Sequence, residues 1–255
     1  MKTHIELITP VITAGIRTLD EVHPFEREDL RITHCLIESG PASIESEFDE
    51  ALCVPDTIRR AIEAERRGAN AIIIDCMGDP GLAACREAVT VPVVGPAQTA
   101  MHVASMLGHR FAFITVLQRL RAVIAKLVAG YGLNDTYGSF RAVDIPVLDI
   151  EKNPGVLQQA LAREAIAAVK EDHVDAIVLG CTGFLGCASA MRKSLLDAGC
   201  DVPVIDPIPL AVQMADALVK TGLSHSKRTY PQPGRKKIQG YTLPEFNAAA
   251  AAVRS

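Results

Sequence analysis

The chain lacks the features that mark several large classes of protein. Its formal net charge is −4 over 255 residues, so it has no excess of basic side chains for a nucleic-acid backbone. Its apolar runs have the length of strands, far short of a membrane span, and residues 1–6 hold no apolar stretch of a secretion signal. We therefore expect a cytoplasmic protein that binds no nucleic acid and no membrane, and whose partner is a small molecule.

Motifs for metals and organic cofactors are also missing. The chain has no C-x-x-C or H-E-x-x-H pattern for zinc, no Gly-x-Gly-x-x-Gly fingerprint for a dinucleotide and no context for a pyridoxal Schiff base. Its seven cysteines are an odd number spread along the chain, unlike a secreted disulfide framework, so we expect thiols. The sequence predicts that the protein uses no metal and no cofactor.

What the chain does have is enough apolar material for a core, with 49% hydrophobic residues. Short β-branched runs alternate with longer stretches of helical period, a pattern typical of a parallel sheet with crossover helices. Eight strands are predicted, at residues 5–8, 30–37, 71–75, 91–94, 111–115, 141–148, 176–179 and 202–205. Because eight is also the strand number of a TIM barrel, that fold has to be weighed.

An internal repeat argues against the barrel. Residues 70–76 recur as 175–181, and residues 91–96 recur as 202–207. Two shorter matches lie upstream in the same order and at nearly the same spacing, pairing 7–9 with 113–115 and 30–31 with 140–141. We infer a duplicated unit that forms two similar, doubly wound parallel-sheet α/β domains related by a pseudo-twofold, with an active site in the cleft between them.

The repeat also sets the expected domain boundaries. The first domain comprises residues 1–96 plus 208–255, and the second comprises 97–207. The apolar helical pattern after residue 208 ends at Gly222, a plausible C-cap, and is expected to return over the first half. The basic tract 224–240 is either a solvated surface loop or a lid that attracts an anionic substrate.

Two cysteines occupy equivalent places in the repeat. Cys76 and Cys181 each follow a predicted buried strand and precede a glycine-containing turn. Ligands of α/β sheets bind at the carboxyl ends of strands, beside helix N-termini. Such a position also lowers the pKa of a thiol and favours a reactive thiolate.

A pseudo-twofold would aim the two thiols at one point from opposite sides. Inverting a carbon centre requires a base on one face and an acid on the other, and two equivalent groups suit a reaction that runs both ways. The pair Cys76 and Cys181 therefore predicts a racemase or epimerase. The remaining cysteines have no such symmetry and are expected to be structural; they are Cys35, Cys53, Cys85, Cys187 and Cys200.

At these residues the chain resembles the aspartate/glutamate/hydantoin racemase superfamily, and within it the hydantoin and allantoin racemases. The matching stretches are 41–50, 78–82, 91–95 with 100–102, and 178–183. The resemblance implies two α/β domains with the site between them, no cofactor, and Cys76 and Cys181 as opposing acid and base at a carbon next to a carbonyl.

The resemblance also implies a set of substrate-binding residues. Met77, Gly78, Thr182 and Gly183 match neighbours that hold the substrate's carbonyl or carboxylate oxygens. The full set is Thr9, Pro10, Val11, Ser43, Met77, Gly78, Thr115, Val116, Thr182 and Gly183. The chain departs from the family in the first loop, where residues 9–12 read Thr-Pro-Val-Ile instead of Asn-Pro-Asn-Thr. The substrate stays open between a hydantoin-like or allantoin-like ring and an amino-acid-like molecule.

Three other functions remain as alternatives. An arylmalonate-type decarboxylase needs one cysteine at the second position, so Cys76 argues against it. A maleate-type cis–trans isomerase uses two cysteines, but its motifs match less closely. A non-catalytic, two-lobed ligand-binding protein would share the fold, but would have no need for both thiols. For any of these functions we also expect a homo-oligomer.

Overall fold

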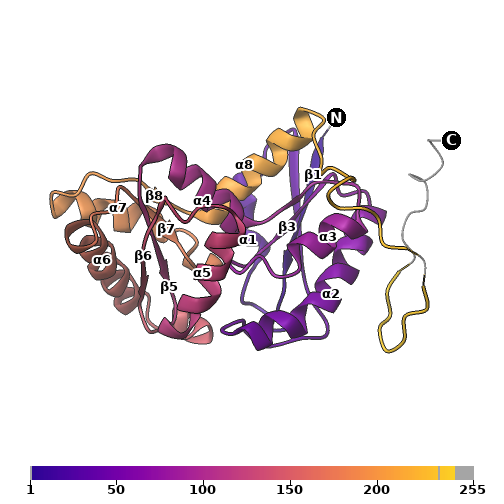
Figure 1. Cartoon of the computed structure of the whole chain (residues 1–255), viewed down its shortest axis with the longest axis horizontal. Helices are drawn as coiled ribbons and strands as arrows, with labels where there is room; N and C mark the ends of the chain where they lie inside the picture. Colours follow the sequence, from indigo (N-terminus) through magenta and orange to yellow (C-terminus); the bar gives the residue numbers. More distant parts are fainter. Residues whose placement is uncertain (1, 235, 245–255) are drawn as a thin grey trace.

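The computed structural model describes residues 2–234 and 236–244, which form two four-stranded parallel sheets side by side (Figure 1). The first sheet has the order β2-β1-β3-β4, with β1 at Thr3–Thr9, β2 at Leu30–Leu36, β3 at Ala71–Ile74 and β4 at Val93–Val94. The second has the order β6-β5-β7-β8, with β5 at Phe111–Thr115, β6 at Tyr137–Ala142, β7 at Ala176–Leu179 and β8 at Val204–Ile205. Two sheets replace the closed barrel that eight strands also allow.

Helices cover both faces of each sheet. The α-helices are α1 at Leu19–Val22, α2 at Glu47–Arg66, α3 at Leu82–Ala88, α4 at Pro96–Leu107, α5 at Arg121–Gly130, α6 at Pro154–Glu171, α7 at Cys187–Asp197 and α8 at Pro207–Lys220. Short 3-10 helices are η1 at His23–Phe25, η2 at Gln118–Leu120, η3 at Val147–Lys152 and η4 at Thr182–Phe184. No helix in the described ranges is both long and apolar enough to cross a membrane.

Alternation along the central strands builds a core on each face of the first sheet. Ile72 and Ile74 pack on the side of α2 and α3, whereas Ala71 and Ile73 pack on the side of α8. All four side chains are fully buried. A strand covered on both faces must be apolar at every position, which explains the unbroken apolar run that predicts β3.

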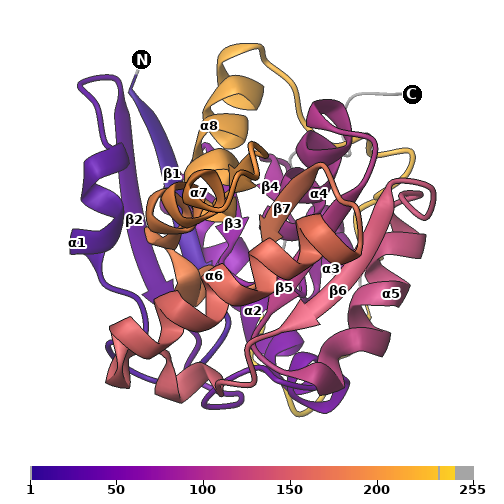
Figure 2. The same cartoon turned by 90° about the vertical axis from the view of Figure 1, so that its left-hand side faces the viewer.

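The helices that follow β4 and β8 cross between the halves. Helix α4 places Ala97 and Met101 in the core of the second sheet, and α8 places Ile208 and Val212 against the first sheet. The two helices contact each other in the middle of the molecule (Figures 1 and 2), while α6 and α7 lie on the outer side of the second sheet (Figure 2). The expected return of the last helix is therefore seen, and the domain boundaries themselves stay a prediction.

Strand register tests the internal repeat residue by residue. Leu7 pairs with Ile73, and Phe113 pairs with Val178, so β3 and β7 occupy equivalent positions. The pairs of β3 with β4 and of β7 with β8 correspond in the same way. The α/β fold class with two similar parallel sheets is confirmed.

One repeat match and several strand boundaries are wrong: the strand predicted at 141–148 lies at 137–142, and those predicted at 91–94 and 202–205 begin two residues later. Leu7 pairs with His34 and Phe113 with Phe140, so Phe140 corresponds to His34 and not to Leu30. Strand β6 ends at Ala142, because Asp144 has a φ of 55° and Pro146 lacks an N–H, and both prevent a continued ladder. Edge strands have only one neighbour, so their sequence defines their limits poorly.

Candidate active site

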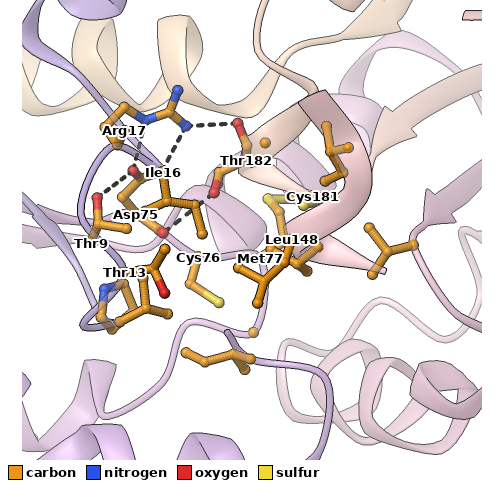
Figure 3. Close-up of a pocket in the computed structure, with 18 of the residues that line it drawn as sticks. Thr9, Thr13, Ile16, Arg17, Asp75, Cys76, Met77, Leu148, Cys181 and Thr182 are labelled. Carbon is orange, nitrogen blue, oxygen red and sulfur yellow. Dashed lines mark hydrogen bonds and ion pairs between the residues drawn. The ribbon is translucent and has the colours of Figure 1, made fainter. Parts of the chain in front are cut away.

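A cavity of about 380 Å³ lies between the two halves, where the carboxyl ends of the central strands meet. Cys76 and Cys181 both line it, one from each half (Figure 3). The predicted binding residues that also line it are Thr9, Pro10, Val11, Met77, Gly78, Thr115, Val116, Thr182 and Gly183. Ser43 does not; the next residue, Ile44, lines the cavity in its place, because a sequence match does not define which side chain of an irregular loop faces inward.

The two cysteine loops have the same hydrogen-bond pattern. The Cys76 carbonyl accepts from Asp79 N at 3.1 Å, and the Cys181 carbonyl accepts from Phe184 N at 3.1 Å. Each thiol accepts the main-chain N–H of the glycine two residues later, Gly78 or Gly183. Each cysteine is half-buried. The repeat thus presents two thiols in matched loops.

Burial raises the pKa of both thiols, contrary to the depression expected at a helix N-terminus. It raises the pKa of Cys181 to about 12 and that of Cys76 well above its ordinary value, with the glycine N–H groups acting the other way. The reason is structural: Cys76 is followed by a turn and Cys181 by the short η4, so neither thiol sits at the start of a full helix. Both cysteines are therefore protonated at neutral pH.

A buried ion pair that the sequence analysis missed joins the first loop to the cysteine loops. Arg17 Nε donates to Asp75 Oδ2 at 2.9 Å, and both side chains are at most 2% exposed. Arg17 Nη2 also donates to the Thr182 carbonyl at 2.7 Å, so this one side chain connects the halves (Figure 3). Asp75 directly precedes Cys76, which was the one signal available in the sequence.

The threonines predicted to bind substrate donate their hydroxyl groups to the protein. Thr9 Oγ1 donates to Asp75 Oδ2 at 2.7 Å, and Thr115 Oγ1 donates to the Gly180 carbonyl at 2.7 Å. Thr182 Oγ1 donates to the Asp75 carbonyl at 3.3 Å. These residues hold the segments before the cysteines. Among the described residues, the main-chain N–H groups of Met77 and Thr182, two residues that line the cavity, have no hydrogen-bond acceptor.

Asp79, in the segment 78–82, ties the first cysteine loop to the second half. Its carboxylate accepts from Ala97 N at 3.1 Å and Gln98 N at 2.8 Å at the start of α4, and from Tyr131 Oη at 2.6 Å. Burial raises the pKa of Asp79 to about 6. The residue therefore positions the loop that carries Cys76 and lies outside the cavity lining.

The rest of the cavity wall is largely apolar. The side chains that give it this character are Ile16, Ile44, Leu120, Val123, Ile124, Val147, Leu148 and Ile150. Arg17 is the only Lys or Arg among the described lining residues, and Asp75 and Glu21 neutralise it. No group of three potential metal ligands occurs in the described ranges.

The basic tract after α8 lies against the first half. Ser224 donates to the Thr90 carbonyl, His225 bonds the main chain of Val93, and Lys227 Nζ donates to carbonyls at the end of α3. None of the described residues of 224–240 lines the cavity. The structure therefore favours a surface segment over a lid. This segment lies across α3 and β4 and is hydrogen-bonded to them.

The chain matches the family model for Asp/Glu/hydantoin racemases over residues 17–215. It is 39% identical to a hydantoin racemase from a Pseudomonas species over 215 residues, 84% of each chain, and 36% identical to one from Rhizobium meliloti over 243 residues, 94% of this chain and 99% of the other. The structure of an allantoin racemase from Klebsiella pneumoniae superposes with a TM-score of 0.86 at 32% identity, covering 94% of this chain and 97% of that one.

Proposed function

The chain belongs to the Asp/Glu/hydantoin racemase family and is a racemase, and we propose that it racemises hydantoins by exchanging a proton between Cys76 and Cys181. The observation that carries the proposal is the pair of thiols in matched loops on one cavity. Inversion needs an acid and a base on opposite faces of one carbon, and the two halves supply one thiol each.

In the proposed reaction one thiolate removes the proton from the ring carbon next to the carbonyl. The C–H electron pair moves into the ring and leaves negative charge on the carbonyl oxygen. The free N–H groups of Met77 and Thr182 are suitable donors for that oxygen, because preorganised dipoles stabilise charge that develops in the transition state. The other cysteine then donates its proton to the opposite face, giving the mirror image and leaving the roles of the thiols exchanged.

The cavity lining supports a neutral substrate with an apolar substituent. Its one described guanidinium, Arg17, is already paired with Asp75, so it offers no spare charge to a substrate carboxylate. The aliphatic wall suits an alkyl or aromatic group on the ring. Hydantoin racemases among the relatives point to the same ring. Allantoin, named for the structural neighbours, is the second candidate, and the apolar wall makes its polar ureido group the poorer fit.

The test is proton exchange in D₂O with single cysteine variants. Cys76→Ser and Cys181→Ser should each lose racemisation of an alkyl-substituted hydantoin, because a hydroxyl is too weak an acid and base to replace a thiol. Each variant keeps one thiol. Each should therefore still exchange the ring proton of one enantiomer, with opposite preference in the two variants, as followed by NMR and optical rotation.

Full racemisation by Cys76→Ser beside an inactive Cys181→Ser would contradict the two-thiol mechanism. It would indicate an enzyme that needs only one cysteine. Cys187→Ser is the matched control, because Cys187 is half-buried like Cys76 and Cys181 and does not line the cavity. A homo-oligomeric state and a cytoplasmic location stay predictions from the sequence.

A further inference from the structure

The two matched cysteine loops are covered by chemically different side chains. A Cβ on Gly78 would collide with Glu50 Oε1 and lie 3.8 Å from Cys76 Sγ. A Cβ on Gly183 would instead meet Ile150 Cδ1 at 3.0 Å and Cys181 Sγ at 3.4 Å. The absence of a side chain at Gly78 therefore lets the Glu50 carboxyl lie over the first thiol loop, whereas an aliphatic group occupies the equivalent place over the second.

Glu50 has no partner in the part of the chain that the structure describes. It lines the cavity from the first turn of α2, is half-buried, and makes no side-chain hydrogen bond or ion pair there. The other lining carboxylates differ: Glu21 and Asp75 are paired with Arg17, and Glu151 is exposed. The Glu50 carboxyl can therefore accept a hydrogen bond from a molecule that binds in the cavity.

The charged side chains that act on Glu50 are all carboxylates. Burial raises the pKa of Glu50 to about 7, and Glu47 and Asp49 from α2 and Asp79 from the Cys76 loop add to the effect. The thiols of Cys53 and Cys76 also face it. A carboxylate without a donor in such a site gains a charge-assisted hydrogen bond from any N–H that is placed beside it, and repels another anion.

We propose that Glu50 is a specificity-determining residue, whose carboxylate accepts a hydrogen bond from an N–H of the substrate on the Cys76 side of the cavity. The inference rests on the proposed function, since it assumes a ring that carries N–H groups. The same carboxylate disfavours substrates with a carboxylate substituent, because two like charges close together in a half-buried site repel each other.

The test compares two probes, a hydantoin with an isobutyl substituent and one with a carboxymethyl substituent. Glu50→Gln should raise KM for the isobutyl hydantoin about tenfold with little change in kcat, because a charge-assisted hydrogen bond is replaced by a neutral one. It should lower KM for the carboxymethyl hydantoin by about the same factor, because the repulsion is gone.

The pH dependence of KM is the second measurement. Ionisation of Glu50 strengthens its acceptor, so KM of the unaltered enzyme for the isobutyl hydantoin should fall as the pH rises through about 7. Glu50→Gln should abolish this step. Glu28→Gln, which removes an exposed carboxylate that does not line the cavity, should keep both the step and the substrate preference.

Unchanged preference and an unchanged pH step in Glu50→Gln would overturn the inference while leaving the racemase proposal intact. Failure of the unaltered enzyme to racemise any hydantoin would instead overturn the proposed function. If Glu50→Gln does not fold, Glu50→Asp provides the test, because it keeps the carboxylate but shortens the side chain by one methylene. KM for the isobutyl hydantoin should then rise, while the carboxymethyl hydantoin stays disfavoured. An unchanged KM in that variant would also overturn the inference.

Discussion

At the scale of single residues, Asp75 and Arg17 are the pair on which the geometry beside the thiols depends. Burial alone would raise the pKa of Asp75, but the Arg17 guanidinium and the hydroxyl donors hold it below its ordinary value. Ionised Asp75 therefore stabilises the fold fully above the ordinary pKa of a carboxyl group. This stabilisation is lost as the pH falls through the lowered pKa of Asp75. Acid should loosen the contact between the first loop and Thr182.

Asp75→Asn should lower the free energy of unfolding by about 3 kcal/mol, because it leaves the buried Arg17 guanidinium with only the partly exposed Glu21 carboxylate, 3.2 Å away, as counter-charge. Urea titration at neutral pH measures the change. Asp29→Asn, which removes an exposed carboxylate paired with Lys220, should cost much less, because solvent screens an exposed ion pair. Equal losses in the two variants would contradict a structural role for the Arg17–Asp75 pair.

The raised pKa values of the thiols predict the pH profile of the reaction. Burial raises the pKa of Cys181 to about 12, and that of Cys76 is also well above its ordinary value. The base must be a thiolate, and its fraction grows about tenfold per pH unit below the pKa. The value of kcat/KM should therefore rise steadily with pH above neutral, with the opposing thiol still protonated as the acid. A plateau starting near pH 7 in the kcat/KM profile would contradict this prediction.

At the scale of elements, the contacts of the segment after α8 fix it on the surface of the first half, away from the cavity. Lys227 Nζ lies 2.6 Å from the Arg86 carbonyl and also reaches the Glu87 carbonyl, so it caps the carboxyl end of α3. Tyr230 lies over the Arg86 guanidinium. These contacts join a segment far along the sequence to the edge of the first sheet.

Lys227→Met keeps the aliphatic stem and removes the donor to the end of α3. The free energy of unfolding should fall by about 1 kcal/mol, with no change in KM, because Lys227 lies away from the cavity lining. Lys193→Met, an exposed lysine on α7, is the control and should leave both quantities unchanged. A raised KM with unchanged stability would favour the lid after all.

At the scale of the whole molecule, contacts that cross the cleft hold two similar halves around one cavity. Besides Arg17, Glu45 Oε1 accepts from Val147 N at 2.7 Å, and Lys126 on α5 pairs with Glu47 on α2 at 2.5 Å. The asymmetry of these contacts matters for the reaction, because the thiols are equivalent in fold and different in surroundings. The two directions of racemisation are therefore expected to differ in kcat and in KM, whereas kcat/KM must be equal in both because the equilibrium constant between enantiomers is 1.

The proposed two-thiol chemistry predicts a reaction that is independent of metal, because the thiols themselves supply the acid and the base. Dialysis against EDTA should leave the racemisation rate unchanged. Loss of activity that one added metal restores would contradict the prediction.

The sequence by itself determined the features that depend on local pattern. Apolar runs that alternate with helical periods predict the parallel strands, and the recurrence of residues 70–76 as 175–181 predicts two similar halves with Cys76 and Cys181 at equivalent strand ends. The sequence alone shows these features because a strand that is buried on both faces must be apolar at every position. Edge strands such as β6, with one neighbour, leave a weaker signal.

Only the tertiary structure decided what surrounds the two thiols. The pairing of Arg17 with Asp75, the approach of Glu50 to Gly78 and the place of Ile44 instead of Ser43 all join segments far apart in the chain. The direction of the thiol pKa shifts followed from the same cause: desolvation depends on everything packed around an atom, whereas a sequence shows only the neighbours along the chain.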